Sequence, residues 1–113
     1  MKRTMILSLS LAGVMILSIT AIARPGYLQL FRRIEKPPAK SRLDKAACLT
    51  CHVKPGGGKI LNPYGLDFKK NGANEESLKN IRALDSDSDG SDNASEISAG
   101  TLPGDARSKP IAK

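Results

Sequence analysis

Residues 48–52 have the sequence Cys48-Leu49-Thr50-Cys51-His52, which contains both cysteines and the single histidine of the 113-residue chain. Two thiols three positions apart on a helical turn can each form a thioether with one vinyl group of a porphyrin. The histidine that follows can then ligate the iron. Cys-x-x-Cys-His is accordingly the attachment sequence of c-type haem. The stretch predicts one covalent haem c, attached at Cys48 and Cys51 and ligated by His52.

Three other roles for the cysteine pair are less favoured by the surrounding sequence. A redox-active dithiol requires a thioredoxin-like βαβ pattern, which the flanking residues lack. A disulfide across a two-residue loop would constrain the unfolded chain very little. A zinc site would need a second pair of ligands, and the chain has no further cysteine or histidine.

The size of the chain makes a cofactor structurally useful. A length of 113 residues allows one small domain and excludes a Rossmann or barrel scaffold and a large multi-step enzyme. A domain this small, with few large apolar residues, usually needs a disulfide, a metal or a cofactor for stability. A haem would give an apolar plane to the residues expected to pack on it, which are Leu43, Leu49, Val53, Ile60, Leu61, Tyr64 and Phe68.

The N-terminal residues 1–23 predict an export signal. Lys2 and Arg3 precede an apolar run, Met5–Ile22, and Ala21-Ile22-Ala23 has the small-x-small form of a cleavage site. An uncleaved inner-membrane anchor facing the periplasm is the alternative, because the run of 18 residues is just long enough to span a bilayer. In both cases we expect the rest of the chain to be periplasmic or secreted. Cleavage after Ala23 would lower the net charge from +7 to +5 and remove all three methionines.

Loss of the methionines leaves the sixth position of the haem iron without a common ligand. His52 is the only histidine, so a second histidine ligand within one chain is excluded. Methionine ligation, which raises the potential of cytochromes c, is excluded as well if the signal is removed. We expect an open or water-filled position, or an unusual ligand from a partner or from among Lys59, Lys69, Lys70, Tyr64, Asn62 and the amine of Arg24.

A second motif occupies residues 85–96, with the sequence DSDSDGSDNASE. Acidic residues at positions 1, 3 and 5, glycine at 6 and glutamate at 12 match the twelve-residue calcium loop. The expected Ca²⁺ ligands are Asp85, Asp87, Asp89, the carbonyl of Ser91 and a bidentate Glu96. Either Asp92 or Asn93 is expected to bind through water or to cap the following helix.

The charge of this loop fits a bound cation. Its five carboxylates and no cationic residue give −5, and the rest of the cleaved chain carries +10. A solvated acidic linker is the alternative, as charge runs usually are. Position 8 holds Asp92, where sensor loops carry an apolar residue that pairs with a sister loop, and the chain has no second loop. We therefore expect a single structural site.

The chain divides into a basic, Pro-containing irregular arm at 24–40, a haem-binding region at 41–73, a calcium helix–loop–helix at 74–105 and a loose tail at 106–113. Capping signals predict helices over 41–52, from Asn62-Pro63 to Asn71-Gly72, from Asn74 through Leu78, Ile81 and Leu84, and a last one ending at Ala99-Gly100. No strand-like alternation is present. The predicted fold class is all-α with long irregular loops.

The two motifs together resemble a known group of proteins. The run "RPGY…CLTCHVKPGGG…LNPYG.DF" resembles small exported bacterial monohaem c-type cytochromes, and "ALDSDSDGSDNASEISAGTLPGD" is similar to the EF-hand- or thrombospondin type 3-like calcium-binding tails found behind them. The resemblance implies a small cytochrome c-like helical domain. It also implies thioethers at Cys48 and Cys51, a proximal ligand at His52 and calcium ligands at Asp85, Asp87, Asp89, Ser91 and Glu96.

Electron transfer is the function that these features favour. The basic remainder of the chain would steer it to a redox partner with an acidic surface. One alternative is a ligand-binding or sensing haem with an open sixth position, and another is a calcium-ordered binding or assembly module. We expect no enzyme, although weak peroxidase activity stays open. Nucleic-acid binding is not expected because the positive charge is dispersed. Membrane attachment is expected only if the N-terminal segment is uncleaved.

Overall fold

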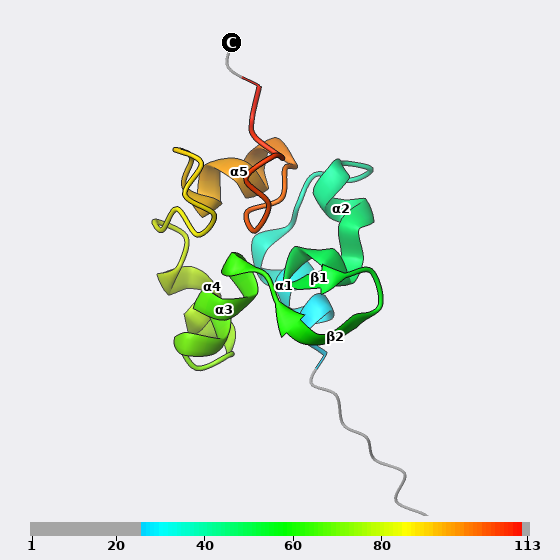
Figure 1. The fold of residues 1–113 in the computed structure, drawn as a ribbon, viewed down its shortest axis with the longest axis vertical. Coiled ribbons are helices and arrows are strands. Elements are labelled where there is room, and N and C mark those ends of the chain that lie inside the picture. The colour runs from blue at the N-terminus through cyan, green and yellow to red at the C-terminus, as the bar shows by residue number, and fades with distance from the viewer. Residues whose placement is uncertain (1–25, 112–113) are drawn as a thin grey trace, which may run out of the picture.

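Short helices around a small hairpin make up the computed structural model, which describes residues 26–111 (Figure 1). The predicted export signal, residues 1–23, lies outside the described residues. Between residues 26 and 111, no helix is both long and apolar enough to cross a membrane. The elements are α1 (Tyr27–Glu35), α2 (Arg42–Ala46), a 3₁₀ turn η1 (Ala47–Thr50), β1 (His52–Lys54), β2 (Gly57–Leu61), α3 (Pro63–Lys70), α4 (Glu75–Asn80) and α5 (Asn93–Ala99).

The all-α prediction is wrong, because the chain forms a small α/β domain. Strands β1 and β2 pair antiparallel, with His52 opposite Leu61 and Lys54 opposite Gly57, and the register is irregular between these pairs. Gly57 and Gly58 have φ angles of 88° and 93°, which residues with a side chain rarely adopt. A glycine run that predicts only a flexible loop thus closes a hairpin, and strands this short carry no visible alternation.

The arm at 24–40 is a helix over much of its length, so the prediction of an irregular segment is also wrong. In α1, Phe31 is 3 % exposed and packs edge-on against Tyr64, with ring centroids 6.1 Å apart. Tyr27 packs edge-on against Phe68 at 5.2 Å. The helix has no side-chain cap at Gly26, which explains why its start gives no sequence signal.

The helix predicted over 41–52 is shorter than expected. Ser41 caps α2 by accepting a hydrogen bond from the Asp44 N–H at 3.1 Å, as the sequence predicts. The Asp44 carboxylate accepts from the Lys40 N–H, one residue before the position that a capping box requires. Ala47 has a φ of 48°, which ends the α-helix, and His52 begins a strand.

The predicted starts of α3 and α4 and the predicted ends of α3 and α5 are confirmed, whereas α4 ends earlier than predicted. Asn62 and Asn74 cap α3 and α4 with their side chains, and Gly100 ends α5 in a left-handed conformation. Leu84 is 43 % exposed, because α4 ends at Asn80 and the predicted stripe does not reach it. The core contains Phe31, Leu43, Tyr64, Phe68, Leu78, Ile81 and Ile97.

The segment from Thr101 to Ser108 packs on the domain. The loose tail predicted from residue 106 therefore does not begin before Ser108. Pro103 and Ser108 are buried, and the Ser108 hydroxyl accepts a hydrogen bond from the Leu102 N–H at 2.9 Å. The Leu43 N–H donates to the Gly100 carbonyl at 2.9 Å, so this segment turns back onto α2 (Figure 1).

Candidate functional site

A cavity of about 720 Å³ lies between α1, η1, the hairpin and α3. Cofactor sites in proteins are mostly apolar cavities of roughly 300–1,000 Å³, so the volume is of the right order. Its wall is mostly apolar and includes Tyr27, Leu28, Phe31, Leu61 and Phe68. Cys48, Cys51 and His52 all line it as well. The structure therefore brings the three residues of the motif onto one apolar cavity.

The two cysteines are one turn apart on η1. The Cys51 N–H donates to the Cys48 carbonyl at 3.2 Å, and both thiols are free and half-buried. Burial, followed by the neighbouring Cys48, raises the pKa of Cys51 to about 12. The raised pKa keeps the Cys51 thiol protonated at neutral pH.

His52 stands at the start of β1, and a glycine lies beside its ring. A Cβ on Gly57 would be 3.9 Å from His52 Nε2 and 3.8 Å from Cδ2, so any larger side chain there would fill the space beside the imidazole. Within residues 26–111, the buried Nδ1 of His52 has no hydrogen-bond partner. No hydrogen bond within the described residues therefore engages Nδ1 of the imidazole.

These residues fit a c-type haem. Two thiols and one imidazole converge on the cavity, and the ring-lined wall could shield an apolar macrocycle. Other residues expected to pack on the haem do not all do so, because Val53 and Ile60 are 57 % and 59 % exposed. Leu43 and Tyr64 lie in the protein core instead.

The structure places only some of the predicted sixth-ligand residues at the cavity. Lys59 and Lys69 line the cavity, whereas Lys70, Tyr64 and Asn62 are not part of its wall. Burial raises the pKa of Tyr64 far above its usual range, and Asn62 uses its side chain in hydrogen bonds to the cysteine turn. The amine of Arg24 lies outside the described residues.

Two residues that the motif does not include hold the cysteine turn in place. The Asn62 side-chain amide donates to the carbonyls of Leu49 and Thr50 at 3.0 and 3.1 Å. A Cβ on Gly65 would overlap the Cys51 carbonyl, so only glycine allows α3 to approach the turn this closely. The Asn-Pro pair predicts the helix start but not this second role of the asparagine.

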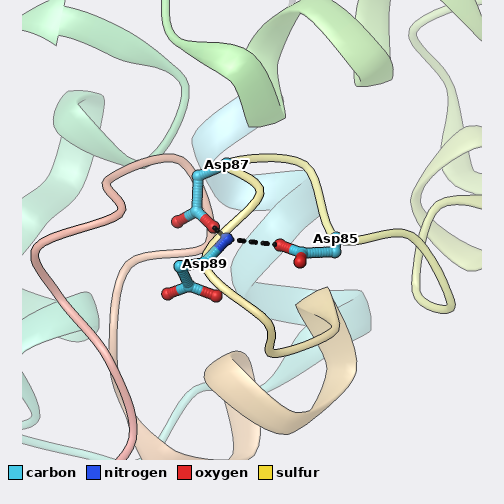
Figure 2. Close-up of side chains that lie close together, drawn as sticks. All are labelled: Asp85, Asp87 and Asp89. Atoms are coloured by element: carbon cyan, nitrogen blue, oxygen red, sulfur yellow. Dashed lines mark hydrogen bonds between the residues drawn. The ribbon is translucent and has the colours of Figure 1, made fainter.

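The acidic residues at positions 1, 3 and 5 of the predicted calcium loop lie close together. Asp85, Asp87 and Asp89 each offer a carboxylate oxygen, and these oxygens lie within 4.8 Å of one another. Figure 2 shows the Asp89 N–H donating to both Asp85 and Asp87, at 3.1 and 3.3 Å. Gly90 has a φ of 93° and donates its N–H to Asp85 at 2.8 Å. The loop is thus folded around its own carboxylates.

Glu96, at position 12, is fully buried on α5. Within the described chain, neither of its carboxylate oxygens has a hydrogen-bond partner, and one buried oxygen each of Asp87 and Asp89 also lacks one. Burial, and then the charges of Asp87 and Asp89, raise the pKa of Glu96 to about 8. Burial, and then Asp89, raise the pKa of Asp87 to about 6. An unpaired buried carboxylate is costly, and hard oxygen ligands of this kind suit Ca²⁺.

The remaining loop residues have structural roles. Asp92 caps α5 by accepting from the Ser95 N–H at 2.7 Å, which confirms the capping alternative for this residue. Asn93 is buried and donates to the Ile81 carbonyl and the Ser86 hydroxyl, each at 2.8 Å. The predicted ligand Ser91 lies in the loop, where its N–H donates to Asp89 at 2.9 Å.

The calcium loop is tied to the helix that borders the cavity. The Ser86 hydroxyl donates to the Asp67 carboxylate on α3 at 2.7 Å. Phe68 and Lys69, which follow directly, line the cavity.

No protein-family model, curated protein or solved structure matches this chain.

Proposed function

We propose that this protein is an exported c-type cytochrome that carries one covalent haem and transfers electrons. The observation that carries the proposal is an apolar cavity onto which Cys48, Cys51 and His52 converge. When bound, haem supplies a one-electron iron couple. The chain holds it through two thiols and one imidazole and excludes water from one side with the aromatic rings of α1 and α3.

The charge around the cavity supports an acidic redox partner. Residues 45–66 include Lys45, Lys54 and Lys59 and no acidic residue. Lys69 adds a further positive charge at the cavity wall. Such a surface steers diffusional encounters towards a negatively charged protein, and the effect weakens with ionic strength.

The second part of the proposal is a structural calcium site at residues 85–96. A solvated acidic linker would leave its carboxylates in water, whereas Glu96 is fully buried with no hydrogen-bond partner in the described part of the chain. A cation among Asp85, Asp87, Asp89 and Glu96 would compensate the charges that burial brings together. These groups come from a loop and a helix, so the ion would join α5 to the loop.

An absorption spectrum and an intact mass of protein made in a periplasm with c-type haem maturation test the haem assignment. We expect a Soret band and the added mass of one haem. Replacing both cysteines, in Cys48→Ala with Cys51→Ala, should remove the covalent mass. A Lys70→Ala variant, outside the cavity wall, serves as the control and should keep it. Absence of both the band and the mass in the wild type would refute the proposal.

A ligand-binding haem is the second candidate, and the ligand inventory favours it. The only histidine is His52, and the three methionines lie in the first fifteen residues. Carbon monoxide added to the reduced protein separates the two candidates. A shifted Soret band indicates an accessible sixth position, whereas an unchanged spectrum indicates a bound protein ligand. Lys59→Ala and Lys69→Ala would then identify which of the two cavity lysines supplies that ligand.

A further inference from the structure

Asn62 connects the cysteine turn to α3 through hydrogen bonds of its side chain and its backbone. Its side-chain N–H groups donate to the carbonyls of Leu49 and Thr50, the two residues between the cysteines. Its backbone N–H donates to the Cys51 carbonyl at 2.9 Å. Its side-chain oxygen accepts from the Gly65 N–H at 2.9 Å. The conformation of the turn therefore depends on where this one amide group is held.

The segment that follows the calcium helix covers Asn62 from behind. A Cβ on Gly104 would overlap the Asn62 amide, and the neighbouring Pro103 is buried. The segment begins at Thr101, whose N–H and hydroxyl both donate to the backbone carbonyl of Glu96, at 2.9 and 3.2 Å. A continuous set of contacts thus runs from Glu96 through residues 101–104 to Asn62.

We propose that Asn62 is a positioning residue for the cysteine turn, and that calcium at residues 85–96 stabilises the turn through it. The inference rests on the calcium site of the proposed function. Without a cation, the buried carboxylate of Glu96 opposes the packing of α5. A ligand that binds only the closed form lowers the population of every local opening that releases it. Opening of α5 would move residues 101–104 away from Asn62 and so loosen the turn.

Hydrogen exchange of the purified full chain, with its cofactor in place, tests this linkage. The amides to follow are those of Cys51 and Asn62, which donate to backbone carbonyls within the turn. Calcium, compared with a chelator, is expected to slow their exchange by about tenfold. At a free concentration of 100 times Kd the limit for complete coupling is about 100-fold. Amides of α1, which no hydrogen bond within residues 26–111 joins to the segment after α5, should change much less.

Two variants test the linkage. One changes the contacts of Asn62 with the cysteine turn, and the other changes its contact with the segment after α5. Asn62→Asp keeps the cap on Gly65 but loses the donors to the turn, and Gly104→Ala displaces the covering segment. Both should bind calcium yet lose most of the calcium-dependent protection. Asn71→Asp is the matched control, because its side chain donates only to the Asp67 carbonyl at the other end of α3. It should keep the protection.

The outcomes separate the linkage from the calcium site itself. A binding isotherm with no calcium-dependent protection of the turn would overturn the linkage alone. The same holds if α1 is protected equally, because calcium would then act only on global stability. No calcium binding by the wild type would overturn the site and the linkage together. If Asn62→Asp exchanges rapidly throughout, Gly104→Ala decides between a positioning role and a purely structural one.

Discussion

Replacing Glu96 by glutamine should have opposite effects on stability with and without calcium. Glu96 is fully buried and has no hydrogen-bond partner among residues 26–111, so its charge is unfavourable in the metal-free fold. Glutamine has nearly the same shape and no charge. We therefore expect Glu96→Gln to be more stable than the wild type in chelator and less stable than the wild type in calcium.

The size of the effect follows from the pKa of Glu96, which burial and the neighbouring aspartates raise from 4.5 to about 8. The unfolded chain loses this proton near its ordinary pKa, and the folded chain retains it to higher pH. The metal-free fold thus loses stability as the pH rises from about 4.5 to about 8. The loss at pH 7 is at most about 3 kcal/mol, and local relaxation reduces it to about 1–2 kcal/mol.

Calcium should reverse this order. At 100 times Kd it adds about 2.7 kcal/mol to the wild-type free energy of unfolding, and much less to a variant without the bidentate carboxylate. Urea unfolding at pH 5, 7 and 8, in calcium and in chelator, measures both effects. Glu76→Gln is the control, since Glu76 is exposed on α4. The reasoning fails if Glu96→Gln is less stable than the wild type in chelator at pH 8.

Two further substitutions test the contacts that α3 makes with the cysteine turn and with the acidic loop. Gly65→Ala should cost about 1–3 kcal/mol of unfolding free energy and lower the yield of covalent haem, because its Cβ would overlap the Cys51 carbonyl. Gly56→Ala, where a Cβ meets nothing within 4 Å, should cost little in the same urea titration. Asp67→Asn should weaken calcium binding about fivefold by calorimetry, because replacing the charge-assisted hydrogen bond from Ser86 with a neutral one costs about 1 kcal/mol.

Local chemistry explains which parts of the fold the sequence could predict. Asn62, Asn74 and Gly100 act within one helical turn of their own positions, so their capping roles are visible in the sequence. Helix α1 has no capping side chain and is held by rings from a distant helix, through Phe31. The hairpin depends on two positive φ angles in a glycine run. Neither feature has a local pattern that would distinguish it from a loop.

In the candidate sites too, features with a local sequence pattern could be predicted, and features that depend on tertiary packing could not. The spacing of the motif predicts that Cys48, Cys51 and His52 act together, and the structure places all three on one cavity. The loop spacing likewise predicts the cluster around Asp87, while the burial of Glu96 emerges only from tertiary packing. The second role of Asn62 requires two segments 12 residues apart to meet, which a single sequence does not reveal.

Helix α3 explains how a domain this small can support two sites. Its first turn is capped by Asn62, which also holds the cysteine turn, and Asp67 near its end accepts from Ser86 of the calcium loop. The helix has only eight residues, so both bonds act on one nearly rigid body. A displacement at either end must move Phe68 and the cavity wall with it. Stabilising the loop with a cation would therefore also fix the cavity wall against which the proposed haem would pack.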